Sequence, residues 1–491
     1  MVVETPVAAG PAPDDLSRRR RIGILAICCM SLLIVGIDVT IVNVALPSIG
    51  KDFHASLSGL QWTVDAYTLV LASLLMISGS TADRLGRRRT FVIGLCTFAL
   101  GSLLCSLAPS LGALVVFRMV QAIGGSMLNP VAMSIITNTF TVPRERAQAV
   151  GIWGAVVGVS MALGPVVGGV LVTSVGWRSI FFINIPIALA AVVLALRYIP
   201  ESKAAVARKV DVPGQLLVIA FLSTLTYGII ELPERGISSP VIMGAFAVAA
   251  VSLAVFLFWE RRAHQPLMDL RFFRSIPFSS ATVIAVAAFA ALGGFLFLNT
   301  LYLQDVRGLS ALQSGVDTLP MAVMTMLASP ISGRIVGHRG SRIPLLIAGL
   351  TLTGSSLMLV GLSATTPFTW LFTAYVIFGL GFGLVNAPIT NAAVSGMPRA
   401  QAGVAAAIAS TSRQIGSTLG VAITGSLVSA SLRPGSHLDF ALASRAGWWV
   451  LAGCGTVVLV LGLVATTAWA RSTAQRTAEA INPEFLEGHA A

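Results

Sequence analysis

The chain has 491 residues, of which 55% are hydrophobic and 11% charged, with a mean hydropathy of +0.86 and a formal net charge of +12. Soluble domains carry roughly 25% charged residues, so this composition excludes an ordinary soluble protein and predicts one embedded in a membrane. The cysteines lie in or beside apolar segments without metal-ligand spacing, and we predict neither disulfides nor a metal site; they are Cys28, Cys29, Cys96, Cys105 and Cys454.

Apolar segments follow one another along almost the whole chain. A helix needs about 20 apolar residues to cross the hydrocarbon core of a bilayer. The first segment follows Arg18–Arg21 but has no small-residue cleavage site after it, which favours an uncleaved span over a signal peptide. In all we predict fourteen spans, at residues 22–47, 61–82, 89–107, 112–138, 146–172, 178–198, 213–231, 240–258, 278–303, 313–335, 343–362, 369–396, 401–430 and 447–470.

The distribution of basic residues predicts the orientation of these spans. Lys and Arg accumulate in short cytoplasmic loops. If both termini are in the cytoplasm, the basic residues on the cytoplasmic side outnumber those on the outer side roughly four to one. The outer set is then only Lys51, Arg178, Arg235, Arg307, Arg433 and Arg445. We therefore predict a multi-pass protein of the cell inner (plasma) membrane with cytoplasmic termini. Topology accounts for the positive charge, so no nucleic-acid partner is expected.

Two longer and more charged cytoplasmic loops, residues 198–212 and 259–277, bracket one pair of spans. We therefore predict an N-terminal tail at 1–21, a six-helix bundle at 22–198, a two-helix insertion with flanking loops at 199–277, a second six-helix bundle at 278–470 and a C-terminal tail at 471–491. The turn at residues 79–89 has a weaker copy at residues 333–342. Duplicated halves of this kind are typical of secondary transporters, whose substrate site lies between them.

Ionisable side chains inside a membrane are costly, so each is a candidate for function. Asp38 lies about halfway through the first span, where desolvation disfavours the charged carboxylate. It is a candidate for proton coupling or substrate contact, and the alternative is a structural acid paired permanently with an arginine. Arg118 in the fourth span keeps its charge. It is either the positive partner that competes with a proton for Asp38 or a hydrogen-bonding link between helices.

Further polar residues in the spans are candidates for substrate contact. Asp65 in the second span either attracts cationic substrates or lies in the wet interface. Asn43 and Gln121 lie in the first and fourth spans near the charged candidates. Asp317, early in the tenth span, and Arg413, inside the thirteenth, are candidates for substrate or ion contact.

The fifth span contains glycines at four-residue spacing together with a proline. Gly158, Gly164, Gly168 and Gly169 give a smooth surface for close helix contact, and Pro165 predicts a kink. This surface serves either packing alone or the rocking of one bundle on another.

Enzymatic motifs are missing from the sequence. Gly50-Lys51-Asp52 lacks the upstream glycine and the following Ser or Thr of a phosphate loop, and neither a His-Glu-x-x-His nor a Gly-x-Ser-x-Gly motif occurs. We therefore expect no enzyme and no cofactor, with a proton gradient as the energy source.

Several motifs together resemble the major facilitator superfamily, and specifically its fourteen-span drug:proton antiporter family. The stretch 79–89 is similar to the superfamily's loop motif, with Asp83, Arg84, Gly86 and Arg87 at its key positions. The first-span pattern of the antiporter family is matched by Asp38, Thr40, Asn43, Ala45, Leu46 and Pro47, with Ile37 in place of its leucine.

The later spans extend this resemblance over nearly the full chain. Arg118, Gln121 and Gly124 match the fourth-span motif, in which Ala122 replaces a glycine. Gly164-Pro165 and Gly168-Gly169 match the antiporter motif of the fifth span, and residues 177–186 are similar to the start of the sixth.

The resemblance implies an all-helical transporter with two six-helix bundles and two extra central helices. Such a monomer exports small amphipathic or cationic compounds, such as drugs, antibiotics and dyes, by proton-driven alternating access. The resemblance also implies a conformational latch at Gly79, Asp83, Arg84, Gly86 and Arg87. One alternative is a dedicated exporter of a single endogenous metabolite or lipid. A non-transporting receptor or enzyme is disfavoured by the membrane-embedded Asp38 and Arg118.

Overall fold

The computed structural model describes residues 17–203, 211–263, 266–394, 402–432 and 439–481, and its regular secondary structure in these ranges is entirely helical. Residues 1–16 and 482–491 of the expected tails lie outside the described residues. The first part of the chain, which we call the N-terminal bundle, comprises α1 (Arg18–Phe53), α2 (Leu57–Leu85), α3 (Arg87–Ser106), α4 (Leu111–Thr139), α5 (Pro143–Ser174), α6 (Ser179–Phe182) and α7 (Asn184–Tyr198).

Two helices, α8 (Val212–Arg235) and α9 (Pro240–Glu260), precede the second large group. That group, the C-terminal bundle, comprises η2 (Leu270–Arg274), α10 (Ile276–Leu301), the π-helical η3 (Tyr302–Val306), α11 (Ala311–Asp317), α12 (Leu319–Arg339), α13 (Arg342–Leu359), α14 (Phe368–Val394), α15 (Ala402–Ser431) and α16 (Asp439–Ala465). A last helix, α17 (Ala468–Ile481), occupies most of the segment expected to be a polar tail. Its Thr473 hydroxyl accepts a hydrogen bond from the Ile276 N–H at the start of α10 (3.0 Å).

Thirteen helical segments among the described residues are long and apolar enough to cross a membrane. The sequence predicted fourteen, and α15 is the segment that makes the difference. This helix is rich in Ser, Thr, Gly and Ala and carries Arg413, which lowers its hydropathy. It nevertheless packs against α2, α8, α10 and α16. Because these helices cover much of its surface, α15 does not need to be as apolar as a helix that faces lipid.

Two predicted spans are broken in the structure. The sixth is divided at Ile183 into α6 and α7, and the tenth is divided at Thr318 into α11 and α12. A proline follows each break, Pro186 in α7 and Pro320 in α12. Proline has no N–H to donate to the carbonyl of the preceding turn, so the helical hydrogen bonding is interrupted just upstream of each proline. Hydropathy does not detect such interruptions because the flanking residues stay apolar.

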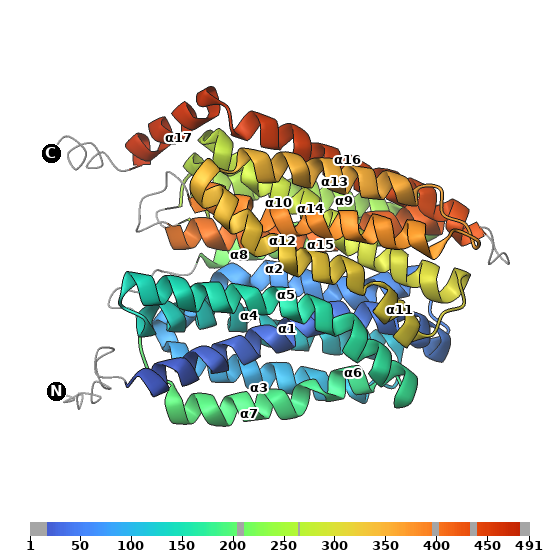
Figure 1. Cartoon of the computed structure of the whole chain (residues 1–491), viewed down its shortest axis with the longest axis horizontal. Helices are drawn as coiled ribbons and strands as arrows, with labels where there is room; N and C mark the ends of the chain where they lie inside the picture. Colours follow the sequence, from blue (N-terminus) through green and yellow to red (C-terminus); the bar gives the residue numbers. More distant parts are fainter. Residues whose placement is uncertain (1–16, 204–210, 264–265, 395–401, 433–438, 482–491) are drawn as a thin grey trace.

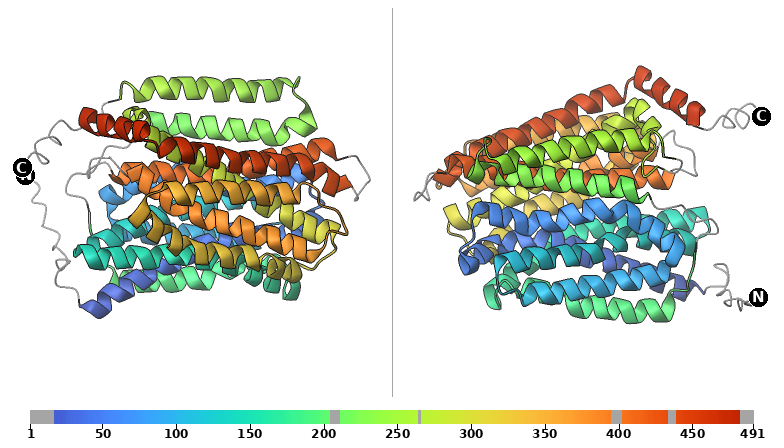
Figure 2. Two further views of the ribbon diagram at one scale, coloured as in Figure 1. Left: turned by 45° about the horizontal axis from the view of Figure 1, so that its top comes forward. Right: turned by 180° about the vertical axis from the view of Figure 1, so that it is seen from behind.

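The two bundles lie side by side with their helices running in the same general direction (Figure 1). The start of α1 and helix α17 lie at the same end of the molecule, which we call the terminal end, as both views of Figure 2 also show. Helix α8 packs against both α2 and α15, so it follows the seam between the bundles. Its Gln215 amide donates to the Ser73 carbonyl of α2, and the Ser426 hydroxyl of α15 donates to the Ile229 carbonyl of α8.

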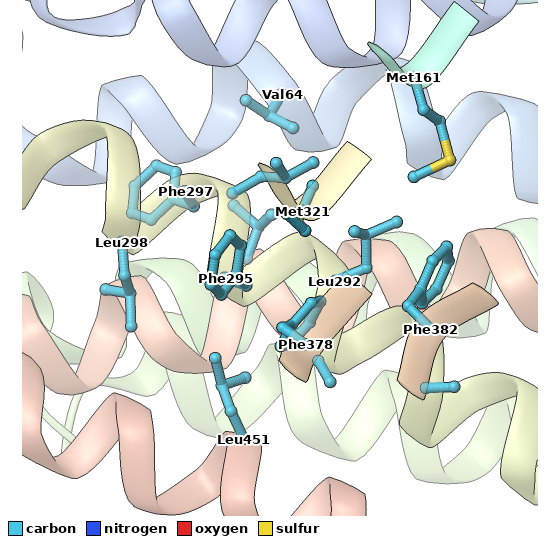
Figure 3. Close-up of a cluster of buried hydrophobic side chains, with 14 of the residues drawn as sticks. Val64, Met161, Leu292, Phe295, Phe297, Leu298, Met321, Phe378, Phe382 and Leu451 are labelled. Carbon is cyan, nitrogen blue, oxygen red and sulfur yellow. The ribbon is translucent and has the colours of Figure 1, made fainter. Parts of the chain in front are cut away.

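The largest hydrophobic core crosses the seam between the bundles. Figure 3 shows Val64 and Met161 of the N-terminal bundle across from Leu292, Phe295 and Met321 of the C-terminal bundle.

Polar contacts across the seam gather away from the terminal end. Gln304 donates to the Val44 carbonyl (2.9 Å), and Gln61 donates to the carbonyls of Val421 (3.2 Å) and Ala422 (2.8 Å). Val44 lies in the second half of α1, Gln61 near the start of α2 and both carbonyls of α15 in its second half. The bundles are therefore joined by buried and partly buried side-chain hydrogen bonds toward the end opposite the termini.

Candidate functional site

Asp38 and Arg118 form an ion pair inside the N-terminal bundle. Arg118 Nη1 on α4 donates to Asp38 Oδ2 on α1 over 2.6 Å, and the two side chains are 1% and 0% exposed. A charge in such surroundings is tolerated only with a partner and further hydrogen bonds. The structure therefore places together the two residues that the sequence singled out as a coupling pair.

Three uncharged side chains complete the surroundings of the Asp38 carboxylate. Gln121 Nε2 (2.8 Å) and Asn184 Nδ2 (3.0 Å) both donate to Asp38 Oδ1. Gln121 also accepts from Arg118 Nη1 (2.7 Å) and donates to the Ser102 hydroxyl (2.8 Å). Hydrogen bonds to an ionised group are roughly twice as strong as neutral ones, and linked bonds polarise one another. Four helices, α1, α3, α4 and α7, are thus tied to one carboxylate.

Sequence reasoning did not assign a role to Asn184 or Ser102. Asn184 is the first residue of α7, directly after the break at Ile183, and is almost completely buried. An amide inside an apolar segment, just before a proline, is a signal that a sequence search for polar residues in spans can detect. Ser102 gives no such signal, because serine is frequent in the interiors of membrane helices.

The opposite side of Arg118 is enclosed by aromatic rings. Its guanidinium carbon lies 4.1 Å from the ring centre of Tyr67 and 5.7 Å from that of Phe181, and Nε donates to the Thr63 carbonyl (3.3 Å). These contacts and those of Asp38 all lie within the N-terminal bundle. In this conformation Asp38 is enclosed, so the geometry suits proton coupling better than direct contact with a substrate.

Asp65 occupies a different position, where α2 faces α15. Gln61 and Thr68, on the same face of α2, both hydrogen-bond to α15, and the Thr418 hydroxyl donates to Thr68 over 2.8 Å. Asp65 is fully buried, and neither of its carboxylate oxygens has a hydrogen-bond partner among the described residues. Asp65 thus lies buried at the seam between the bundles, and a role in attracting cationic substrates stays a prediction. Asn43, also buried, donates to the Val39 carbonyl of its own helix (3.1 Å).

The two candidates in the C-terminal bundle are separated from this network. Asp317 is the last residue of α11 and is partly exposed. Arg413, in the first half of α15, donates from Nη2 to the Thr390 hydroxyl of α14 over 2.7 Å. Its guanidinium carbon lies 5.9 Å from the centre of the Phe289 ring on α10. The structure therefore does not bring Asp317 or Arg413 together with Asp38.

The turn between α2 and α3 holds the residues of the expected latch. Arg87 Nη2 donates to Asp83 Oδ1 over 3.1 Å, within the same turn, and Arg84 is exposed. Gly86 has φ = 112°, a conformation that favours glycine, and a Cβ there would lie 2.5 Å from Glu201 Oε1. A Cβ added at Gly79 would meet open space. A latch that joins the two bundles through these residues stays a prediction.

Glu201, which sequence reasoning did not single out, holds this turn in place. Its carboxylate oxygens accept hydrogen bonds from the backbone N–H groups of Arg88 (3.1 Å) and Arg89 (3.2 Å) in the first turn of α3. The first N–H groups of a helix lack partners within it and favour negative charge. Glu201 therefore caps α3 from the segment after α7 and fixes the orientation of the turn.

Two glycines of α5 face α1 within the N-terminal bundle. A Cβ at Gly164 would lie 1.9 Å from the Thr40 hydroxyl oxygen, and a Cβ at Gly168 would lie 2.6 Å from Ile41 Cγ1. A larger residue at either position would require the Thr40 or Ile41 side chain on α1 to move. The segment of α1 that follows Asp38 is thus packed directly on the glycine surface of α5.

Another face of α5 contacts the C-terminal bundle. A Cβ at Gly169 would lie 2.6 Å from Leu312 Cα, and a Cβ at Gly315 would lie 2.2 Å from the Pro165 carbonyl oxygen. Gly158 faces α12 at ordinary contact distance. The fifth-span motif therefore lies between α1 on one side and α11 and α12 on the other. This position supports its role in packing, and a role in rocking stays a prediction.

Within the described ranges, no three or more His, Cys, Asp or Glu side chains lie close enough together to hold a metal ion. The five cysteines are free thiols.

Comparison with known proteins gives consistent results over most of the chain. Residues 28–421 match the family model of the Major Facilitator Superfamily. The multidrug resistance protein Stp of Mycobacterium tuberculosis is 37% identical over 86% of this chain and 79% of that protein. The tetracenomycin C resistance and export protein of Streptomyces glaucescens is 38% identical over 87% and 79%, respectively. The methylenomycin A resistance protein of Bacillus subtilis is 32% identical over 91% of this chain and 94% of that protein.

Solved structures agree on the fold. A D-xylose–proton symporter has a TM-score of 0.63 at 14% identity and covers 90% of this chain and 97% of its own. A bacterial homologue of the human lysosomal transporter Spinster has a TM-score of 0.61 at 19% identity, with coverages of 94% and 98%. Members of this family are transporters and are generally not enzymes. The resemblance inferred from the motifs is thus confirmed: the chain is a multi-pass membrane protein that belongs to the Major Facilitator Superfamily.

Proposed function

We propose that the protein is a proton-driven antiporter that exports small amphipathic or cationic compounds by alternating access. The observation that carries this proposal is the fully buried Asp38–Arg118 ion pair with its surrounding hydrogen bonds. The names of its relatives, which are drug-resistance and export proteins, support export as the direction of transport.

The ion pair supplies a site where a proton and a guanidinium compete for one carboxylate. When Asp38 is ionised, Arg118, Gln121 and Asn184 all donate to it. Protonation removes the negative charge while Arg118 keeps its positive charge, so the same donors lose most of their attraction. The proton-loaded state therefore favours a different arrangement of α1, α4 and α7.

A shift of α1 reaches the seam through α5. The α1 segment after Asp38 packs on Gly164 and Gly168, while Gly169 and Pro165 on the same helix contact α11. There is little free space at these contacts. A shift of α1 therefore either carries α5 with it or opens the contact between α1 and α5. Proton binding within the N-terminal bundle is in this way linked to opening and closing between the bundles.

The orientation follows from the basic residues. With fourteen spans, α15 included, and both termini in the cytoplasm, the contacts of Gln61 and Gln304 lie toward the extracellular side. The protein is then closed toward the outside in this conformation. Asp83 pairs with Arg87 within its own turn, and the latch to the C-terminal bundle forms when the cytoplasmic side closes. The transporter works as a monomer without a cofactor.

A second candidate function is the export of a single endogenous compound by the same mechanism. The riboflavin transporter RibZ of Clostridioides difficile is 31% identical over 92% of this chain, so a relative named for one compound has similar overall sequence identity. Measuring several unrelated dyes separates this alternative from broad export.

The test is uncoupler-sensitive uptake of the fluorescent cation ethidium into inside-out vesicles that contain wild type or Asp38→Asn protein. We expect the wild type to accumulate the dye under a proton gradient and the variant to lose this accumulation. Asp52→Asn is the matched control, because Asp52 is an exposed acid on the same helix, paired with Arg178 at the surface.

Three results are informative. Accumulation in wild type and Asp52→Asn but not in Asp38→Asn supports the mechanism. Accumulation by Asp38→Asn that still responds to the uncoupler would contradict proton coupling through this carboxyl. Accumulation by wild type that is unchanged when the uncoupler is added would contradict proton-driven transport.

A further inference from the structure

Arg413 lies inside the membrane helix α15, and no acidic side chain among the described residues pairs with it. Its Nη2 group donates to the Thr390 hydroxyl over 2.7 Å, while its Nε lies buried without a hydrogen-bond partner among the described residues. The ion pairs formed by the described residues do not include Arg413. One hydroxyl dipole compensates little of the cost of a desolvated charge. The guanidinium is therefore able to accept a negatively charged partner.

The surroundings of Arg413 are aromatic on one side and not fully covered by protein on another. Phe289, 5.9 Å from the guanidinium carbon, packs edge-on against Phe382 with ring centres 5.1 Å apart. Arg413 and Phe289 are partly exposed and Thr390 is exposed, in contrast to the sealed Arg118. These residues come from α10, α14 and α15, and α10 and α15 also contact helices of the N-terminal bundle. A flat aromatic molecule with an acidic group is chemically complementary to this surface.

Arg118 shows what a structural or coupling arginine looks like in the same protein. It has a carboxylate, an amide, a carbonyl and an aromatic face as partners. If Arg413 served only to join helices, it would be expected to have a comparable set. A carboxylate matches the planar fork of a guanidinium and forms two parallel, charge-assisted hydrogen bonds with it. The unpartnered Nε belongs to that fork.

We propose that Arg413 binds the anionic group of the exported compound, so that the substrates include acidic or zwitterionic aromatic molecules. This inference rests on the proposed export function and extends its substrate class beyond amphipathic cations. The carboxylate of the compound pairs with Arg413 while its ring system lies against Phe289.

The experiment compares two dyes that differ only in charge at one group. Rhodamine 110 carries a free carboxylate, and rhodamine 123 is its methyl ester. Uncoupler-sensitive uptake of each dye is measured in inside-out vesicles with wild type, Arg413→Gln and Arg413→Lys. Arg476→Gln is the matched control, because Arg476 is exposed on α17 and undergoes the same chemical change.

We expect Arg413→Gln to raise KM for rhodamine 110 about tenfold or more, because a charge-assisted hydrogen bond contributes about 1.5–3 kcal/mol. Rhodamine 123 uptake should change less than about twofold, and Arg413→Lys should be intermediate because lysine keeps the charge but lacks the fork. Arg476→Gln should affect neither dye. If Arg413→Gln does not fold, the selective loss of rhodamine 110 in Arg413→Lys decides the question.

Two outcomes would overturn this inference while leaving the proposed function intact. One is a wild type that exports rhodamine 123 but not rhodamine 110. The other is an equal loss of both dyes in the Arg413 variants, which would assign the residue to structure. A wild type with no uncoupler-sensitive uptake of either dye, or of ethidium, would instead overturn the proposed function and this inference with it.

Discussion

The two bundles each contain an arginine within a membrane helix, and their surroundings are opposite. Arg118 is enclosed, paired with Asp38 and stacked on Tyr67. Arg413 is partly exposed and bonded to one threonine hydroxyl. A charge in a membrane helix therefore has no fixed role, because the groups around it determine what it can do. We infer a division of labour, with proton coupling in the N-terminal bundle and recognition of the compound in the C-terminal bundle.

The largest expected difference between the two arginines is in stability. Arg118→Gln leaves the Asp38 carboxylate buried without its counter-charge, and breaking a buried ion pair in this way costs about 3–5 kcal/mol of unfolding free energy. Arg413→Gln removes a charge that has no ionic partner in the described part of the chain, so we expect a change within about 1 kcal/mol. Thermal unfolding of the two purified variants in the same detergent measures the contrast.

The double variant with Asp38→Asn and Arg118→Gln serves as the control. It should recover part of the lost stability, because neither charge remains buried alone. Equal destabilisation by Arg118→Gln and Arg413→Gln would remove the basis of the comparison.

A smaller effect is expected from Asn184, which supports the coupling pair without carrying charge. Asn184→Ala removes one donor to Asp38 Oδ1 and should cost about 1–3 kcal/mol of unfolding free energy. Under the inferred roles of the two bundles this network does not contact the compound, so we expect a lower maximal rate for rhodamine 110 and rhodamine 123 alike, with KM unchanged.

Initial rates of vesicle uptake over a range of dye concentrations give both parameters for Asn184→Ala. Asn386→Ala provides the stability control, because the Asn386 amide donates to the backbone carbonyl of Phe382 in its own helix. A rise in KM for one dye alone would place Asn184 in substrate recognition and so contradict the division of labour.

Much of this organisation was predictable because the membrane makes certain residues conspicuous. Long apolar segments located the helices, and Asp38 and Arg118 stood out as charges within them. The sequence also suggested that they pair, and in the structure Arg118 Nη1 lies 2.6 Å from Asp38 Oδ2. Their role in proton coupling stays a prediction.

The remaining parts of the site depend on three-dimensional proximity that a single sequence does not encode. Ser102 and Asn184 are uncharged, and only the packing of α3 and α7 brings Asn184 to the Asp38 carboxylate and Ser102 to the Gln121 amide that also bonds it. Glu201 did not stand out because it lies in a polar loop. It caps α3 although it is more than a hundred residues away in the sequence. Hydropathy also did not predict the breaks before Pro186 and Pro320. A span can stay apolar while its backbone hydrogen bonds are interrupted.

The smallest expected effect separates the aromatic surface from the charge beside it. Phe289→Leu keeps an apolar side chain but removes the ring near Arg413 and its edge-on contact with Phe382. Aromatic pairs contribute about 0.5–1.5 kcal/mol beyond burial, so we expect KM to rise about two- to tenfold. Rhodamine 110 and rhodamine 123 share the same ring system, and both should be affected equally. Their KM ratio, measured by vesicle uptake, should therefore stay at the wild-type value in Phe289→Leu while it changes in Arg413→Gln. A ratio that changed in both variants would mean that charge and ring are not recognised separately, and the C-terminal surface would then act as a single apolar contact whose arginine only orients the phenylalanine.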